Sequence, residues 1–190
     1  MGLSAGIRGH DNPLSLLEKS RVLYTREEVM ESVDRIAHQI NQFYGDESII
    51  LLSVMTGAML PAAWLATRLK MPVQMDFVHA TRYQSGLHGA ELEYRVPPRF
   101  ELEGRKVLVV DDIFDEGDTL AAIKGSVEKR KAESVHLAVL VRKMHDRGLS
   151  RDFVDFVGLD VPDVYVFGCG MDAYEEWRHL DQILVLEEGE

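Results

Sequence analysis

The sequence predicts an α/β protein: a doubly wound, mainly parallel sheet with a small hood from the two ends of the chain. Apolar runs that suit strands alternate with segments of helical periodicity. The runs are apolar on both faces, as in parallel sheets, and helices separate them. We expect a single domain over 1–190, with its core at about 25–145 and the hood at about 1–24 and 146–190.

The first long helix is predicted to begin at Thr25. Thr25 and Glu28 have the spacing of a capping box, and an apolar helix face follows at Val29, Val33, Ile36, Ile40 and Phe43. Four apolar strands are then expected, at 48–54, 73–78, 106–111 and 134–141, with helices at 59–70 and 121–131. Shorter apolar runs follow at 153–157, 164–167 and 183–186, with a short aromatic helical piece before the last.

The charge and cysteine content of the chain indicate which kinds of binding partner and cellular compartment to expect. A net charge of -11 argues against a nucleic-acid or membrane-surface role, because both favour a basic face. The single cysteine, Cys169, excludes an internal disulfide and fits a reducing compartment. We find no signal-peptide pattern and no apolar run of membrane-spanning length, so a cytoplasmic location is expected.

The end of the central strand is the main candidate site. Val107–Val110 is followed by the acidic pair Asp111 and Asp112, and then by Asp115 and Gly117. Ligands of parallel sheets bind beyond the carboxyl ends of the strands, where carboxylates can hold sugar hydroxyls and magnesium. A glycine turn into a helix start can hold a phosphate on backbone N–H groups. The plain structural alternative is that one of these carboxylates only caps the next helix.

This string resembles the phosphoribosyl pyrophosphate motif of the phosphoribosyltransferases, and the bacterial hypoxanthine-guanine enzymes are the most similar. The resemblance implies that Asp111 and Asp112 contact the ribose hydroxyls and magnesium. It makes Asp115 the catalytic proton acceptor near purine N7. The loop that would cradle the 5′-phosphate comprises Asp115, Glu116, Gly117, Asp118 and Thr119. Glu116 and Asp118 depart from the family pattern, and their charge would repel a phosphate.

A second block resembles the hood of the same family, in Asp155–Gly158, Val161–Asp163, Tyr165–Gly168, Met171-Asp172 and Trp177–Leu180. The resemblance implies that Tyr165 stacks on the purine and that the backbone of Val166 reads it. Lys143 would contact the 6-oxo group, Asp172 would bind a second magnesium largely through water, and Arg178 would contact pyrophosphate. Three alternatives stay open: a core strand at 164–167, Arg142 in place of Lys143, and a surface role for Arg178.

Two further loops resemble the family's pyrophosphate site. The loop 54–58 would grip pyrophosphate through Thr56 and Gly57, with Thr56 where lysine is usual and a cis peptide expected between Met55 and Thr56. The segment 80–83 resembles the start of the mobile catalytic loop, with Arg82 and Tyr83 as pyrophosphate contacts. The polar run to about Gly89 would be a lid, or else an ordinary hairpin.

The resemblance implies purine salvage: hypoxanthine or guanine and phosphoribosyl pyrophosphate give IMP or GMP and pyrophosphate, with magnesium, in a homodimer or homotetramer. Xanthine-guanine or adenine preference and a non-catalytic nucleotide-sensing regulator are the alternatives. A dinucleotide fingerprint at Gly168, Gly170 and Ala173 is rejected, because the chain ends before the further strand and acidic residue that it requires. The seven histidines are scattered and form no recognised zinc motif.

Overall fold

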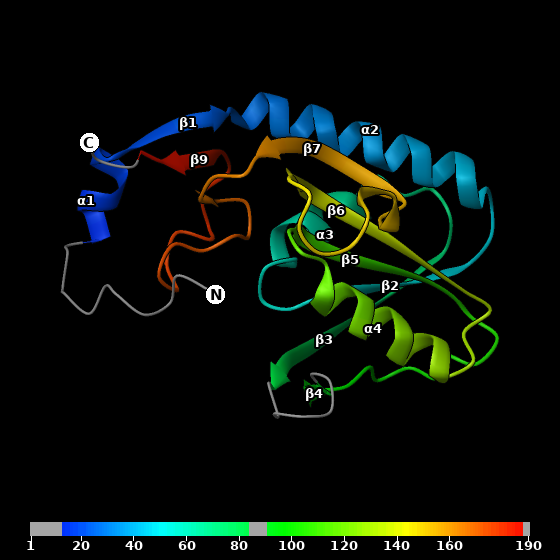
Figure 1. Cartoon of the computed structure of the whole chain (residues 1–190). Helices are drawn as coiled ribbons and strands as arrows, with labels where there is room; N and C mark the ends of the chain where they lie inside the picture. Colours follow the sequence, from blue (N-terminus) through cyan, green and yellow to red (C-terminus); the bar gives the residue numbers. More distant parts are fainter. Residues whose placement is uncertain (1–12, 84–90, 188–190) are drawn as a thin grey trace.

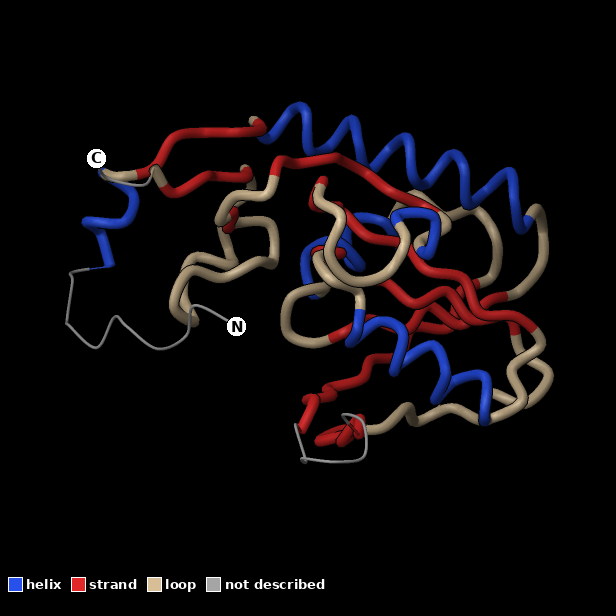
Figure 2. The backbone as a smooth tube through the Cα atoms, in the orientation of Figure 1, coloured by secondary structure: helices blue, strands red, loops and turns tan. Residues whose placement is uncertain are grey.

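A computed structural model describes residues 13–83 and 91–187, which form two sheets and four α-helices (Figures 1 and 2). The large sheet has six strands in the order β4-β3-β2-β5-β6-β7. Their bounds are β2 Ile49–Val54, β3 Val73–Tyr83, β4 Glu91–Val96, β5 Lys106–Phe114, β6 Ser134–Met144 and β7 Phe156–Pro162. All neighbours in this sheet are parallel except β3 and β4, so the predicted α/β class with a mainly parallel sheet is confirmed.

Helices cover both faces of the large sheet. The crossovers β2-α3-β3 and β5-α4-β6 run toward opposite edges, and right-handed crossovers therefore place α3 (Met59–Ala66) and α4 (Asp118–Lys129) on opposite faces (Figure 1). The long helix α2 (Arg26–Tyr44) contacts α3 and β7. None of the helices among the described residues has both the length and the apolar character to cross a membrane.

The cap of α2 forms as predicted. The Glu28 N–H donates to Oγ1 of Thr25, and the Thr25 N–H donates to Oε2 of Glu28 at 2.8 Å. One residue of the predicted apolar face is wrong: Phe43 is 56% exposed, and Tyr44 is buried instead. An α-helix has 3.6 residues per turn, so Tyr44, four residues after Ile40, lies on the same buried face.

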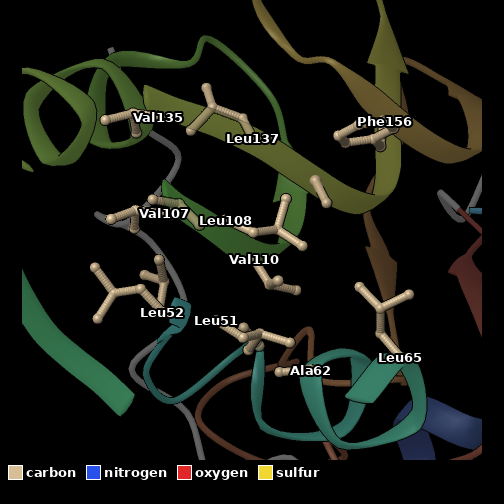
Figure 3. Packing of buried hydrophobic residues seen from close by; sticks show 14 of the residues in the cluster. Leu51, Leu52, Ala62, Leu65, Val107, Leu108, Val110, Val135, Leu137 and Phe156 are labelled. Atoms are coloured by element: carbon tan, nitrogen blue, oxygen red, sulfur yellow. The ribbon is translucent and has the colours of Figure 1, made fainter. Parts of the chain in front are cut away.

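The centre of the core lies between the sheet and its helices. Strands β2, β5 and β6 supply its middle layer, and α3 adds Ala62 and Leu65 (Figure 3). Phe156 of β7 packs at the edge of the same cluster. Because β2 is buried along its whole length and pairs with strands on both sides, its position is set by packing on every side.

A small three-stranded antiparallel sheet joins the two ends of the described chain. Its order is β1-β9-β8, with bounds β1 Ser20–Tyr24, β9 Ile183–Leu186 and β8 Val166–Phe167, and the short helix α1 (Pro13–Glu18) precedes β1. In Figure 1 these elements lie together at one end of the molecule. The expected hood began too early, at residue 146, because β7 pairs in parallel with β6 and extends the large sheet.

Two further expectations differ from the structure. The polar stretch after β3 contains β4, which pairs antiparallel with β3 at the sheet edge. The predicted aromatic helical piece is not a helix, because positive φ angles at Tyr174, Glu175 and Trp177 interrupt helical backbone.

Candidate active site

The predicted site lies at the carboxyl end of β5. A cavity of about 360 Å³ opens there, between the end of the strand and the start of α4. Its lining comprises Asp111, Asp112, Ile113, Asp115, Glu116, Gly117, Asp118, Thr119 and Leu120. All seven residues predicted to bind ribose and its 5′-phosphate therefore line one cavity.

Gly117 makes the turn into α4 and is its N-cap, with φ of 83°. A Cβ at this position would lie 2.8 Å from Cζ of Phe114, so both the backbone angle and the packing require glycine. The first N–H groups of a helix lack intrahelical partners and can bind an anion. The residues of the first turn of α4, Asp118, Thr119 and Leu120, line the cavity.

Asp111 and Asp112 form a buried acidic pair at the strand end, with 8% and 9% of their surface exposed. The Asp112 N–H donates to Oδ1 of Asp111 at 2.9 Å, and the Ile113 N–H donates to Oδ1 of Asp112 at 2.8 Å. Burial, together with the neighbouring Asp112 charge, holds the pKa of Asp111 well above its usual value. Burial also raises the pKa of Asp112, although hydrogen bonds and Arg178 oppose the rise. The negative charge of this acidic pair is therefore only partly compensated by the described residues.

Two glycines bring other loops against Asp112. A Cβ at Gly57, in the loop after β2, would lie 2.8 Å from Oδ1 of Asp112 and closer still to its Cγ and Oδ2. A Cβ at Gly170 would lie 3.0 Å from the carbonyl carbon of Gly57. The peptide between Met55 and Thr56 is cis, as predicted. The backbone of the loop after β2 thus packs directly against Asp112, and the backbone of the loop after β8 packs against the loop after β2.

Arg178 ties the C-terminal segment to this edge. Its Nη1 donates to the Gly170 carbonyl at 2.8 Å and lies 4.0 Å from Oδ2 of Asp112. Its Nη2 lies 2.6 Å from Oδ1 of Asp172, whose Oδ2 accepts from the Glu175 N–H at 2.9 Å. The structure therefore brings Arg178 and Asp172 together beside Asp112.

Tyr165 and Val166 lie side by side in the chain but differ in exposure. Tyr165 is 46% exposed, its hydroxyl donates to the Asp172 carbonyl at 3.2 Å, and its ring stacks on that of Tyr174. Val166 is buried in β8. An accessible aromatic face thus stands next to the Asp172 and Arg178 pair.

Asp115 is held by two side chains from the end of β6. Its Oδ2 accepts from Lys143 Nζ at 3.0 Å, and its Oδ1 lies 2.6 Å from His145 Nε2. Burial raises the pKa of Asp115, but the hydrogen bonds from Lys143 and His145 outweigh it, so this pKa lies below its usual value. Asp115 is therefore an ionised carboxylate at neutral pH.

Strand alternation separates Lys143 from its neighbour Arg142. Successive side chains of a strand point to opposite sides, so Lys143 reaches the β5 loop while Arg142 does not. Arg142 forms a two-bond pair with Asp160 of β7, at 2.7 and 3.1 Å, and donates to the Arg151 carbonyl. Of the neighbours Arg142 and Lys143, Lys143 is the one that contacts Asp115 at the candidate site.

Three residues at this place have no role predicted from the sequence: His145, Arg147 and Asp163. Arg147 binds both carboxylate oxygens of Asp163, at 2.5 and 2.9 Å, and its Nε lies 3.7 Å from Oε1 of Glu116. Their place in the chain could have indicated the site for two of them, because His145 and Arg147 follow shortly after the carboxyl end of β6, which lies next to β5. Arg147 also supplies a cation beside the unexpected Glu116.

Among the described residues, one group could offer three ligands to a metal ion: Asp115, His145 and Asp163, whose ligand atoms lie within 4.8 Å of one another. Lys143 and Arg147 already neutralise its two carboxylates. In the part of the chain that the structure describes, the cation beside the pair of Asp111 and Asp112 is Arg178, whose Nη1 lies 4.0 Å from Oδ2 of Asp112. A hard divalent cation therefore fits the pair better than the group around His145.

The predicted catalytic loop is described in part. The backbone of Arg82 and Tyr83 ends β3, paired with Leu92 and Glu91. Their side chains and the expected lid at 84–90 lie outside the described residues.

Comparisons with known proteins agree with this geometry. The family model described as phosphoribosyl transferase domain matches residues 22–176. The hypoxanthine-guanine phosphoribosyltransferase of Streptococcus thermophilus is 30% identical over 176 residues, covering 91% of this chain and 97% of that protein. The Bacillus subtilis enzyme of the same name is 31% identical over 168 residues, covering 88% and 93%.

A solved structure of a hypoxanthine-guanine phosphoribosyltransferase from Bacillus anthracis superposes with a TM-score of 0.80 at 29% identity, covering 87% of this chain and 97% of that one. A hypoxanthine phosphoribosyltransferase from Staphylococcus aureus has the same fold, with a TM-score of 0.84 at 24% identity and coverage of 92% and 95%. The match of the family model, over residues 22–176, includes the acidic pair and the loop that follows it. The chain therefore belongs to the phosphoribosyltransferase family.

Proposed function

We propose that this protein transfers the phosphoribosyl group of phosphoribosyl pyrophosphate to hypoxanthine or guanine, giving IMP or GMP and pyrophosphate, in purine salvage. The observation that carries the proposal is the meeting of the two strand ends. Beside one cavity, the carboxyl end of β5 supplies an acidic pair and a glycine turn into α4, and β6 supplies a lysine bonded to Asp115. The named relatives act on the same bases.

In the reaction, the bond between C1′ and the pyrophosphate oxygen breaks, and its electron pair leaves with pyrophosphate. Purine N9 forms the new bond to C1′, and the purine gives up a proton. Asp115 is ionised and lies directly after β5. It accepts or shares that proton at N7. Proton transfer of this kind contributes about 10² to 10⁴ in rate.

The ribose and phosphate sites follow the elements. Asp111 and Asp112 accept hydrogen bonds from the ribose hydroxyls, and the backbone of the loop from Asp115 to Thr119 holds the 5′-phosphate. Arg147 beside Glu116 reduces the repulsion that this side chain exerts. Pyrophosphate would meet Gly57 and Arg178, with Thr56, Arg82 and Tyr83 as further contacts.

The acidic pair fits magnesium, since two adjacent buried carboxylates whose pKa values are raised favour a hard cation with oxygen ligands. When bound, magnesium would neutralise charge on the leaving pyrophosphate. Asp172, already bonded to Arg178, suits contact through water. We further place the enzyme in the cytoplasm as a homodimer or homotetramer.

Lys143 is the residue that selects between 6-oxopurines and adenine. A lysine donates to a 6-oxo group, whereas adenine presents an amino group that also donates, so adenine would leave the lysine opposed. Tyr165 would offer its exposed ring to the purine face, and Val166 its backbone.

Initial rates with hypoxanthine, guanine and adenine test this assignment. The wild-type enzyme should use both oxopurines and leave adenine untouched. Lys143→Ala should lose most of its kcat/KM with the oxopurines, and Arg142→Ala, whose side chain faces Asp160, should lose little. Adenine as the best substrate, or a larger loss in Arg142→Ala, would overturn it.

A further inference from the structure

His145 contacts Asp115 directly at the candidate site. Its Nε2 lies 2.6 Å from Oδ1 of Asp115, and its side chain is only 6% exposed. The oxygen it meets differs from the one that Lys143 meets. The two donors therefore hold the carboxylate from both of its oxygens.

The hydrogen bonds of the ring define its tautomer. The backbone N–H of Arg147 donates to Nδ1 of His145 at 3.1 Å. A backbone N–H can only donate, so Nδ1 is the unprotonated nitrogen and Nε2 carries the hydrogen. That hydrogen faces the Asp115 carboxylate, so His145 donates to it.

The loop that carries His145 is packed against the loop that carries Asp115. The Leu149 N–H donates to the Glu116 carbonyl at 2.9 Å. A Cβ at Gly148, whose φ is 76°, would lie 2.6 Å from Cα of Glu116. The ion pair of Arg147 with Asp163 holds the other side of the same loop. The backbone positions of His145 and Asp115 are thus coupled by direct contacts.

From this geometry we infer that His145 is a positioning residue, which keeps the Asp115 carboxylate aimed at the purine while Lys143 turns to the 6-oxo group. The inference rests on the proposed function. When Lys143 donates to a purine oxygen, fewer of its three N–H donors remain for Asp115. His145 has no such second task, so its bond to Oδ1 persists through the reaction.

The chain offers a graded set of variants at this position. In His145→Gln, the side-chain amide nitrogen comes close to the place of Nε2 and can still donate. In His145→Asn, the amide is one carbon shorter and falls near the place of Nδ1. His145→Leu keeps bulk but has no donor. Circular dichroism and thermal melting show which variants are folded.

The first measurement is kcat and KM with hypoxanthine. His145→Leu and His145→Asn should lower kcat by about tenfold or more, with the KM for phosphoribosyl pyrophosphate unchanged, and His145→Gln should recover most of the loss. Equal kcat in all variants, or a Gln variant no better than the Asn variant, would overturn the inference. Should the Leu variant fail to fold, the Gln and Asn pair still decides.

The second measurement does not depend on turnover. Carboxyl carbon NMR of the free protein, with the Asp115 signal assigned by Asp115→Asn, gives the pKa of Asp115 in each variant. Charged groups facing Asp115 are Lys143 from β6, Arg147 from the following loop and, across Arg147, Asp163 and Glu116. These are the same in every variant.

Loss of the His145 donor should raise the pKa of Asp115 in the Leu and Asn variants but not in the Gln variant, and the acid limb of kcat/KM should move to higher pH with it. An unchanged pKa in all variants would overturn the inference. A wild-type protein that forms no nucleotide would refute the proposed function alone, because the NMR result would still report the bond between His145 and Asp115.

Discussion

Gly57→Ala is the substitution whose effect the structure defines most closely. The loop after β2 passes so near Asp112 that an added methyl group would lie 2.8 Å from Oδ1, and nearer to Oδ2 and Cγ, whereas ordinary contact begins at 3.4 Å. Asp112 is held by the Ile113 N–H, so the methyl group must displace either the carboxylate or the loop by roughly 1 Å. A misplacement of that size at a reacting centre costs on the order of 100-fold in rate.

The matched control is Gly125→Ala in α4. An added Cβ there meets nothing within 4 Å, and alanine in a helix is more stable than glycine by about 0.5–1 kcal/mol. This variant should melt at a slightly higher temperature and keep wild-type rates. Steady-state rates with hypoxanthine and thermal melting of both variants test the contrast. A folded Gly57→Ala protein within twofold of wild-type kcat/KM would refute the reasoning.

Three other predictions follow from the charges and burial. Asp115→Asn should lower kcat by about 10² to 10³ with little change in binding of phosphoribosyl pyrophosphate, since the amide cannot take a proton, and single-turnover rates near wild type would remove Asp115 as the base. The pKa of Asp111 is raised in the folded state, so its ionisation destabilises the fold once the pH exceeds the unfolded value of about 3.9. Asp111→Asn, melted in EDTA, should therefore gain stability at pH 7 and lose that gain as the pH falls to about 3; an equal gain at both pH values would contradict the pKa direction. Burial raises the pKa of the Cys169 thiol to about 12, so the native protein should react slowly with a thiol reagent at pH 8 and rapidly in guanidinium, and fast reaction of the native protein would contradict its burial.

Local pattern was sufficient for most of the sheet. Apolar runs buried on both faces predicted β2, β5 and β6, because such runs need no knowledge of their neighbours to be read as strands. The acidic pair and Gly117 were found for a related reason: they follow directly on one of these runs. Residues that share a short stretch of chain keep their relation in any fold.

Pairing between distant segments was not predictable in the same way. β7 has only a partly buried alternation, and what makes it a strand of the large sheet is its partner β6 and the close approach of Gly158 to the Leu140 carbonyl. β4 depends likewise on β3.

The partners of Asp115 depended on side-chain direction. From the sequence, either Arg142 or Lys143 could reach the site, because both lie at the end of the same strand. The pairing of β6 with β7 brings Asp160 beside Arg142, which bonds to it. His145 and Arg147 lie in a loop whose course is set by contacts with the Glu116 backbone. Such contacts leave no periodic signal in the sequence.

An analysis of products tests whether the protein transfers a phosphoribosyl group to a 6-oxopurine. The protein, hypoxanthine, phosphoribosyl pyrophosphate and magnesium are incubated, and nucleotide and pyrophosphate are quantified by chromatography. IMP and pyrophosphate should form in equal amounts, Asp115→Asn should form about 10² to 10³ times less IMP in the same time, and no AMP should form when adenine replaces hypoxanthine. Phosphoribosyl pyrophosphate that remains bound but unconverted, with no nucleotide from hypoxanthine or guanine, would contradict the account and favour a non-catalytic sensor.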